Sequence, residues 1–258
     1  RDYKGEIMME NKMFCYQCQE TVGNQGCSQV GVCGKTPETA GLQDLLIDVT
    51  KGLAEVINEV RCKGKEINNV YDDQVSENLF ITITNANFDD QMIIEAVRKT
   101  LTLKKELLLQ LDDQAVLSNR ALWMEMEIEA IEKRMQMVGV LETADEDIRS
   151  LKQLITYGLK GMAAYNKHAH ALGFRKDEID RFIETTLVKI ETSTMSLNDY
   201  VALTMETGKY GVQVMELLDQ ANTSTYGNPE ITEVNIGVRN NPGILVSGHD
   251  LKDLEMLL

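Results

Sequence analysis

The sequence Met13-Phe-Cys-Tyr-Gln-Cys-Gln-Glu20, followed by Gly26-Cys-Ser-Gln-Val-Gly-Val-Cys-Gly-Lys-Thr-Pro37, holds four of the five cysteines of this 258-residue chain. Their spacing is Cys15-x2-Cys18-x8-Cys27-x5-Cys33. A Cys-x2-Cys pair places two sulfurs on one tight turn, and two more cysteines close by can complete a four-sulfur site. Glycines in the loop let the backbone bend and turn its N–H groups toward sulfur. We therefore predict that residues 13–36 form a metal-binding loop around which the chain is organised.

Three kinds of site are compatible with clustered cysteines. Disulfides are the least favoured, because the cysteine total is odd and we expect no secretory signal. A four-cysteine zinc site tolerates these spacings, although the second half of the loop lacks a Cys-x2-Cys pair. An iron–sulfur cluster accepts more varied spacings within one compact loop. The spacing by itself leaves zinc and iron–sulfur open.

Composition excludes some classes of partner. The chain carries a formal net charge of -15, which repels the phosphates of nucleic acids and of anionic membranes. We therefore expect no nucleic-acid and no membrane partner. The sequence contains no run of about 18 or more apolar residues, the length that a membrane-spanning helix needs. Free cysteines and the absence of an export segment lead us to expect a cytoplasmic location.

Most of the chain has the periodicity of helices. Thr36-Pro37-Glu38 combines a hydroxyl N-cap, a proline at the first helical position and an acid in the first turn. Apolar residues then recur at steps of three and four as far as Val60, so we expect one long helix ending near Lys63-Gly64. Similar patterns predict helices in residues 80–84, 93–111, 121–138, 145–172, 176–192 and 196–221. The predicted fold is mainly α, with long-helix bundles in residues 37–221.

Both ends of the chain have a different character. We expect residues 1–12 to be a poorly ordered upstream extension. Residues 222–241 are rich in turn-forming side chains, and Gly243–Ser247 is a short apolar run. A strand there, a turn at His249 and a helix N-capped by Asp250 would be the opening unit of an α/β domain. Residues 222–258 are therefore predicted to be a linker and the start of a truncated α/β domain.

Three stretches resemble one known family. Met13-Phe-Cys-Tyr-Gln-Cys-Gln-Glu-Thr21 with Gly31-Val-Cys-Gly-Lys35, Tyr157-Gly-Leu-Lys-Gly-Met-Ala-Ala-Tyr165, and Pro242-Gly-Ile-Leu-Val-Ser-Gly-His-Asp-Leu251 are similar to the hybrid cluster (prismane) proteins, or hydroxylamine reductases. The resemblance runs from Met13 to the last residue. It implies a [4Fe-4S] cluster bound by Cys15, Cys18, Cys27 and Cys33, because family members with longer gaps carry a [2Fe-2S] cluster instead.

The resemblance also implies a second site. The matching histidine, His249, is a ligand of the hybrid [4Fe-2S-2O] cluster, where hydroxylamine is reduced to ammonia and nitric oxide is also reduced. Family members supply two glutamates and four cysteines to that cluster further along, and no cysteine follows Cys62 here. We therefore expect this chain to be the N-terminal part of a longer oxidoreductase, inactive by itself, whose parent receives electrons from a protein donor.

Two alternatives remain at this point. One is a non-catalytic electron-transfer or scaffold module with a single cluster, and the other is a zinc-stapled helical interaction domain. Three further residues are predicted not to be metal ligands. Cys62 has no cysteine near it in the sequence, whereas His168 and His170, two residues apart on a helix, point in different directions.

Overall fold

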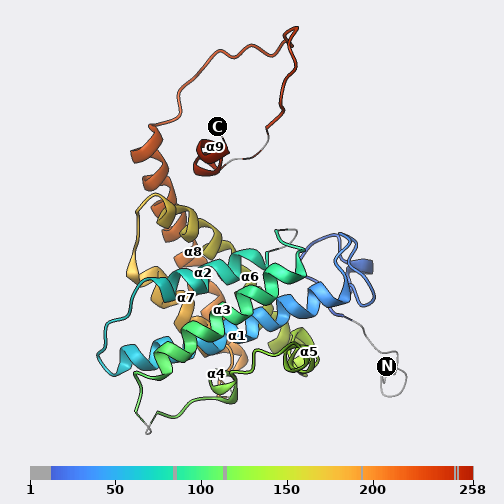
Figure 1. Ribbon diagram of the computed structural model, residues 1–258, viewed down its shortest axis with the longest axis vertical. Coiled ribbons are helices and arrows are strands. Elements are labelled where there is room, and N and C mark those ends of the chain that lie inside the picture. The colour runs from blue at the N-terminus through green and yellow to red at the C-terminus, as the bar shows by residue number, and fades with distance from the viewer. Residues whose placement is uncertain are drawn as a thin grey trace.

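The computed structural model describes residues 13–83, 86–112, 115–192, 194–246, 248 and 250–257. Within these residues the chain forms nine α-helices, two short 3₁₀ helices and no β-sheet, so the mainly α prediction is confirmed. The predicted extension at residues 1–12 lies outside the described part. The cysteine loop lies at the N-terminal end of the first long helix (Figure 1).

Helix α1 (Pro37–Cys62) is the axis of the molecule. The Thr36 hydroxyl accepts a hydrogen bond from the Thr39 N–H at 3.1 Å, and Pro37 occupies the first turn, as the sequence predicted. The helix ends at Cys62, with Lys63 as its C-cap and Gly64 following at φ +72°. Nearly its whole apolar stripe is buried, which fixes its position relative to the helices around it.

Two apolar clusters share α1. Its first half packs with α3 (Asp90–Leu108) and α5 (Ile128–Met135). Its second half packs with α2 (Val70–Ile81) and α7 (Asp177–Lys189), and the same apolar cluster continues into α6 (Glu146–Ala171) and α8 (Leu197–Tyr226). One continuous helix therefore joins both cores, and it begins directly behind the cysteine loop.

The predicted helix over 121–138 is interrupted, and this prediction is corrected. The structure has the short α4 (Asn119–Leu122), an irregular stretch, then α5. In that stretch the Trp123 carbonyl accepts from the buried Lys104 ammonium at 2.8 Å, and the Met126 carbonyl accepts from Arg98 at 3.2 Å. Because these two carbonyls accept hydrogen bonds from cations of α3, they do not take part in the hydrogen bonds of a continuous helix.

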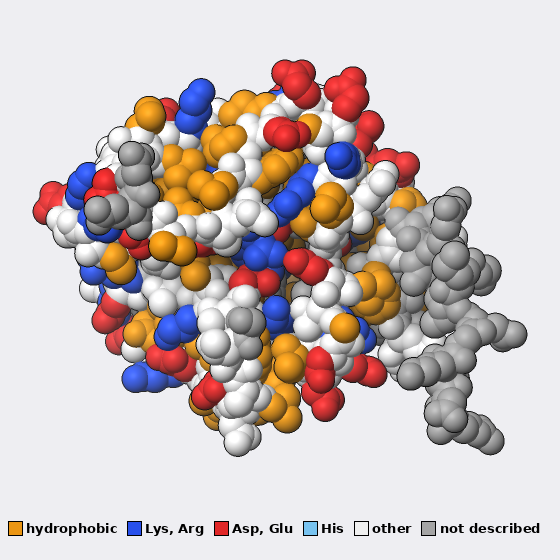
Figure 2. Space-filling view, turned by 90° about the horizontal axis from the view of Figure 1, so that it is seen from below, with side chains coloured by type: hydrophobic (Ala, Val, Ile, Leu, Met, Phe, Trp, Pro, Cys, Tyr) orange, Lys and Arg blue, Asp and Glu red, His pale blue; other side chains and the backbone are white. Residues whose placement is uncertain are grey.

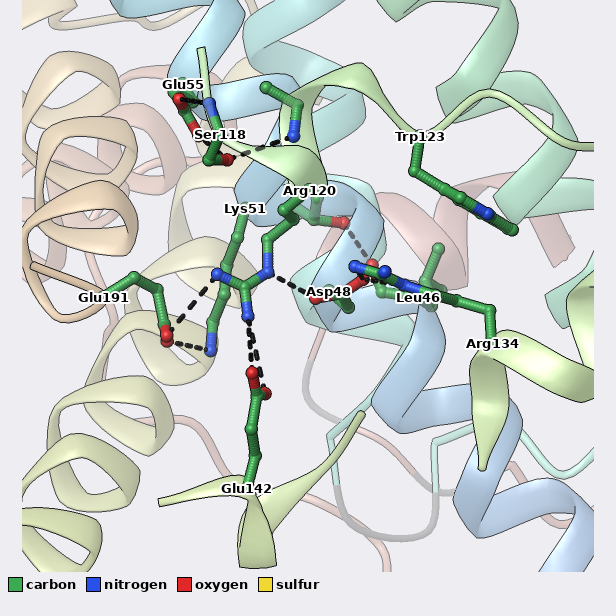
Figure 3. A network of polar contacts seen from close by, with 12 residues as sticks. Leu46, Asp48, Lys51, Glu55, Ser118, Arg120, Trp123, Arg134, Glu142 and Glu191 are labelled. Atoms are coloured by element: carbon green, nitrogen blue, oxygen red, sulfur yellow. Dashed lines mark hydrogen bonds and ion pairs between the residues drawn. The ribbon is translucent and has the colours of Figure 1, made fainter. Parts of the chain in front are cut away.

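A polar network fastens α4 and α5 to the α1 axis (Figure 3). Arg120 and Arg134 both pair with the buried Asp48 carboxylate. Glu191 pairs with Lys51 at 2.6 Å, with Lys152 at 3.4 Å and with Arg120 at 3.5 Å. Burial acts to raise the pKa of Glu191, but Lys51, Arg120 and Lys152 outweigh it and lower that pKa to about 2.

The outer surface carries interspersed charges. On the face drawn in Figure 2, acidic and basic side chains alternate with small apolar areas. This arrangement is typical of solvated helix faces, the ordinary explanation of a strongly acidic composition. Within the described residues, no helix is long and apolar enough to cross a membrane.

The C-terminal part differs from the prediction. Helix α8 continues to Tyr226, five residues beyond the predicted boundary at 221. Residues 243–246 form no strand and are exposed, because a strand needs a hydrogen-bonding partner that the described residues do not supply. The predicted helix is present as α9 (Leu251–Leu257), and the Asp250 carboxylate caps it by accepting from the Asp253 N–H at 2.8 Å.

Candidate metal centre

The two halves of the cysteine loop are held together by main-chain hydrogen bonds. Cys15 and Cys27 form an isolated antiparallel bridge, with N–H to carbonyl distances of 3.0 and 2.8 Å. The chain turns between them through the 3₁₀ helix η1 (Val22–Asn24). The Thr21 hydroxyl closes this turn by donating to the Cys15 carbonyl at 3.1 Å. The bridge places the first Cys-x2-Cys pair against the second half of the loop.

Hydrogen-bond donors surround the sulfur of Cys27. Its side chain is buried, and its sulfur accepts N–H groups from Val22 and Val32, while the Thr21 hydroxyl lies 3.8 Å away. Burial acts to raise the pKa of this thiol, but these donors and the charge of Lys35 outweigh it and lower the pKa. A thiol with a lowered pKa is suited to the thiolate form in which cysteine binds metals.

Gly31 packs closely beside Cys33. A Cβ atom added to Gly31 would lie 3.1 Å from the Cys33 sulfur and 3.0 Å from the Lys35 Cβ. A larger residue here would push on the Cys33 sulfur, and the Gly31 N–H donates to the Lys35 carbonyl at 2.8 Å. Cys33 itself is exposed, so this edge of the loop faces solvent.

The structure also shows which cysteines do not come together. All five cysteines are free thiols, so the disulfide alternative is not formed. Cys62 ends α1, about 37 Å along the helix from Pro37, too far to join the loop. Among the described residues, no group of three or more Cys, His, Asp or Glu side chains is arranged to hold a single metal ion.

Two buried lysines, Lys35 and Lys160, line a small cavity beside the loop. A cavity of about 30 Å³, room for one or two waters, is lined by Cys15, Gln17, Lys35, Lys160 and neighbouring side chains. Both lysines are almost completely buried. The Lys35 ammonium donates to the Gln43 side chain at 2.6 Å, and Lys160 donates to the Gln17 side chain at 3.2 Å and to the Thr82 carbonyl at 3.0 Å.

These two buried lysines were not predicted from the sequence. Lys160 lies within the quoted stretch Tyr157–Tyr165, but no role was predicted for it. The available signal was a lysine on the apolar face of a helix, flanked by the buried Leu159 and Met162. Burial lowers the pKa of Lys160 to about 8, against the opposing influence of Asp44. Burial raises the pKa of Asp44, which borders the same cavity, to about 7.

Comparison with known proteins identifies the family. The family model described as "Prismane/CO dehydrogenase family" matches residues 13–258. The chain belongs to the prismane/CO dehydrogenase family. It is 59% identical over 250 residues to the hydroxylamine reductase of Desulfovibrio desulfuricans, covering 97% of this chain and 46% of that protein. It is 54% identical over 255 residues to the hydroxylamine reductase of Clostridium perfringens, covering 95% of this chain and 46% of that protein. The chain thus spans about half the length of the curated relatives it matches.

For this prismane family member, the residues of the loop fit a metal–thiolate group on three counts. Four cysteines from one loop are a soft donor set suited to iron–sulfur clusters or zinc. N–H groups aimed at the Cys27 sulfur are the kind of hydrogen bond that orients a ligand and stabilises its negative charge. The two buried ammonium groups beside the loop favour an anionic occupant, because two cations and one acid, Asp44, line the same cavity and buried charge without a counter-charge is costly.

The second predicted ligand belongs to the C-terminal part of the chain. His249 lies outside the described residues. Its neighbour Asp250 contacts His168 at 2.9 Å, so Asp250 lies against the C-terminal end of α6. His170 contacts Asp73 at 2.9 Å instead, so the two histidines of α6 turn to different partners, consistent with the prediction from their spacing.

Proposed function

We propose that this chain is the N-terminal, cluster-bearing part of an oxidoreductase of the hybrid cluster protein type. In this proposal Cys15, Cys18, Cys27 and Cys33 bind a [4Fe-4S] cluster, which supplies one-electron transfer when bound. A protein donor provides the electrons. The reaction of the complete protein is the two-electron, two-proton reduction of hydroxylamine to ammonia and water, with nitric oxide as a further candidate substrate.

The observation that carries the proposal is the four-cysteine loop, within a chain 59% identical to a hydroxylamine reductase. The residues around the loop have definable tasks. The Cys15–Cys27 bridge holds the two halves of the loop in register. Val22 and Val32 stabilise the Cys27 thiolate through their N–H groups, and α1 anchors the end of the loop through its Thr36 cap.

The catalytic centre of the complete protein is the finer part of the proposal. His249 would be one ligand of a hybrid [4Fe-2S-2O] cluster, and its other ligands would come from residues beyond this chain. In the sequence, His249 follows an apolar segment whose Ile244 and Leu245 are almost fully exposed, consistent with a surface that packs against further protein. We place the protein in the cytoplasm, where cysteines stay reduced.

Metal analysis of protein purified without oxygen tests the first half of the proposal. We expect a brown protein with about four iron and four acid-labile sulfide per chain. Cys27→Ser should lose most of the iron, whereas Cys62→Ser, the matched control at the far end of α1, should retain it. A colourless protein with one zinc and no sulfide would instead support a zinc-stapled helical domain.

An activity assay tests the second half. With a chemical reductant and hydroxylamine, the 258-residue chain should bind its cluster but form no ammonia, since the proposed catalytic cluster is incomplete. Ammonia formation by this chain would contradict the division of the two clusters proposed here. A complete protein that holds the cluster but reduces neither substrate would favour a non-catalytic electron-transfer role.

A further inference from the structure

Lys160 occupies an unusual position for a lysine. It projects from α6 into the cavity behind the cysteine loop and is only 5% exposed. Its ammonium donates to the side chain of Gln17, the residue between Tyr16 and Cys18, and to the Thr82 carbonyl at the end of α2. One charged side chain therefore connects the cysteine turn to two helices of the bundle.

Neither buried lysine beside the loop has a carboxylate within 4 Å, as far as the described residues extend. Partly buried cations of the chain do have such partners: Arg61 pairs with Asp72, and Lys51 pairs with Glu191. Lys104, a third buried lysine, donates only to carbonyls among the residues described, as Lys160 does in part, but it lies on α3. Asp44 borders the same cavity but makes no ion pair within the described part. The oxygens that Lys160 contacts directly are neutral, and Asp44 acts on its charge only from across the cavity.

A buried charge without a counter-charge is normally destabilising. Asp44 and Cys15 line the same cavity, and the negative charge of each would favour the protonated lysine, Asp44 the more strongly. Four thiolates around a [4Fe-4S] core carry a net charge of about -2, and about -3 after one electron is added. The group that Lys160 would neutralise is thus the occupant of the loop, most strongly in its reduced state.

We propose that Lys160 is a positioning residue whose fixed positive charge stabilises the reduced cluster and so raises its reduction potential. This inference rests on the proposed function, because it needs a cluster on the four cysteines. The step is a one-electron transfer: the protein donor loses one electron, the cluster gains it, and Lys160 keeps its proton throughout. Lys35, on the other side of the cavity, would add to the same field.

The test is an anaerobic redox titration of the 258-residue chain, followed by visible absorption and electron paramagnetic resonance. Iron and sulfide are measured first, so absence of a cluster in the unmodified chain would refute the proposed function before any variant is compared. Lys160→Gln removes the charge and keeps a hydrogen-bond donor. It should make electron uptake about tenfold less favourable, which is about 59 mV for a one-electron couple. Lys160→Arg, which keeps the charge, should restore most of the potential.

Lys104 supplies a matched control. It is also a fully buried lysine that donates to two carbonyls, of Arg120 and Trp123, but it lies on α3. Lys104→Gln should leave the potential unchanged. An unchanged potential in cluster-loaded Lys160→Gln would overturn the inference, and so would an equal fall in Lys104→Gln or in Lys160→Arg.

If Lys160→Gln fails to retain the cluster, the melting temperatures of the metal-free proteins distinguish an electrostatic role of Lys160 from a structural one. If the buried ammonium of Lys160 destabilises the metal-free chain, metal-free Lys160→Gln should melt no lower than the metal-free unmodified chain, because the variant removes that charge. That result, with the cluster retained in Lys160→Arg, supports the inference. A metal-free Lys160→Gln that melts well below the unmodified chain assigns Lys160 a structural role and overturns it.

Discussion

Glu191 offers the sharpest test of the electrostatics of this fold. Its carboxylate lies among Lys51, Arg120 and Lys152 just beyond the end of α7, and its side chain is 20% exposed. The change Glu191→Gln keeps the shape and one oxygen acceptor but removes the negative charge. Three cations would then be left around a neutral amide, although Arg120 would keep its pairing with Asp48.

The magnitude follows from the pKa of Glu191. It falls from an ordinary 4.5 to about 2 in the folded chain. A lowering of about 2.5 pKa units, at about 1.36 kcal/mol each, corresponds to about 3 kcal/mol of folding free energy. Because the folded pKa is the lower one, this stabilisation is complete above pH 4.5 and is lost as the pH falls toward 2. At pH 3 about 1.4 kcal/mol of it should remain.

The assay is urea unfolding of the metal-free chain, followed by far-ultraviolet circular dichroism at several pH values. Glu191→Gln should lose about 2–3 kcal/mol of unfolding free energy at pH 7, and the difference from the unmodified chain should shrink toward pH 3. Glu142→Gln is the control, since Glu142 is half exposed, lies 3.4 Å from Arg120 and should contribute less than about 1 kcal/mol. A loss at Glu191 that does not change between pH 7 and pH 3 would refute the electrostatic explanation.

Further predictions concern the packing of two glycines and the charge of a buried acid. Gly52→Ala should destabilise the metal-free chain by about 1–3 kcal/mol in the same urea assay, because its Cβ would lie 2.6 Å from the Arg120 carbonyl oxygen. Gly161→Ala, in open space on α6, should instead stabilise it by about 0.5–1 kcal/mol. Asp180 has its pKa raised by burial from 3.8 to about 6, so the cost of its charge to folding grows between those pH values and is complete above about pH 6. Asp180→Asn should therefore gain stability over the unmodified chain as the pH rises from about 4 to about 6 and level off above it, and a difference that stays constant from pH 4 to 8 would contradict this assignment.

The sequence by itself determined the local elements of this protein. The Thr36 cap and the apolar stripe to Val60 each depend on residues a few positions apart, and each is found where it was predicted. The cysteine spacing is likewise local, and together with the family match it defines the candidate site. Such features can be read from sequence because their interactions are repeated every turn or span one short loop.

Only the tertiary structure decided what surrounds these elements. Lys160 is 127 residues after Cys33 in the sequence, yet it lies under the loop because α6 packs along α2 there. The break between α4 and α5 arises from cations of α3 that attract carbonyls, and the predicted strand at 243–247 lacks a partner within the described residues. Charge pairing and sheet pairing between distant segments depend on which segments meet in space. No pattern within a few neighbouring residues indicates these contacts.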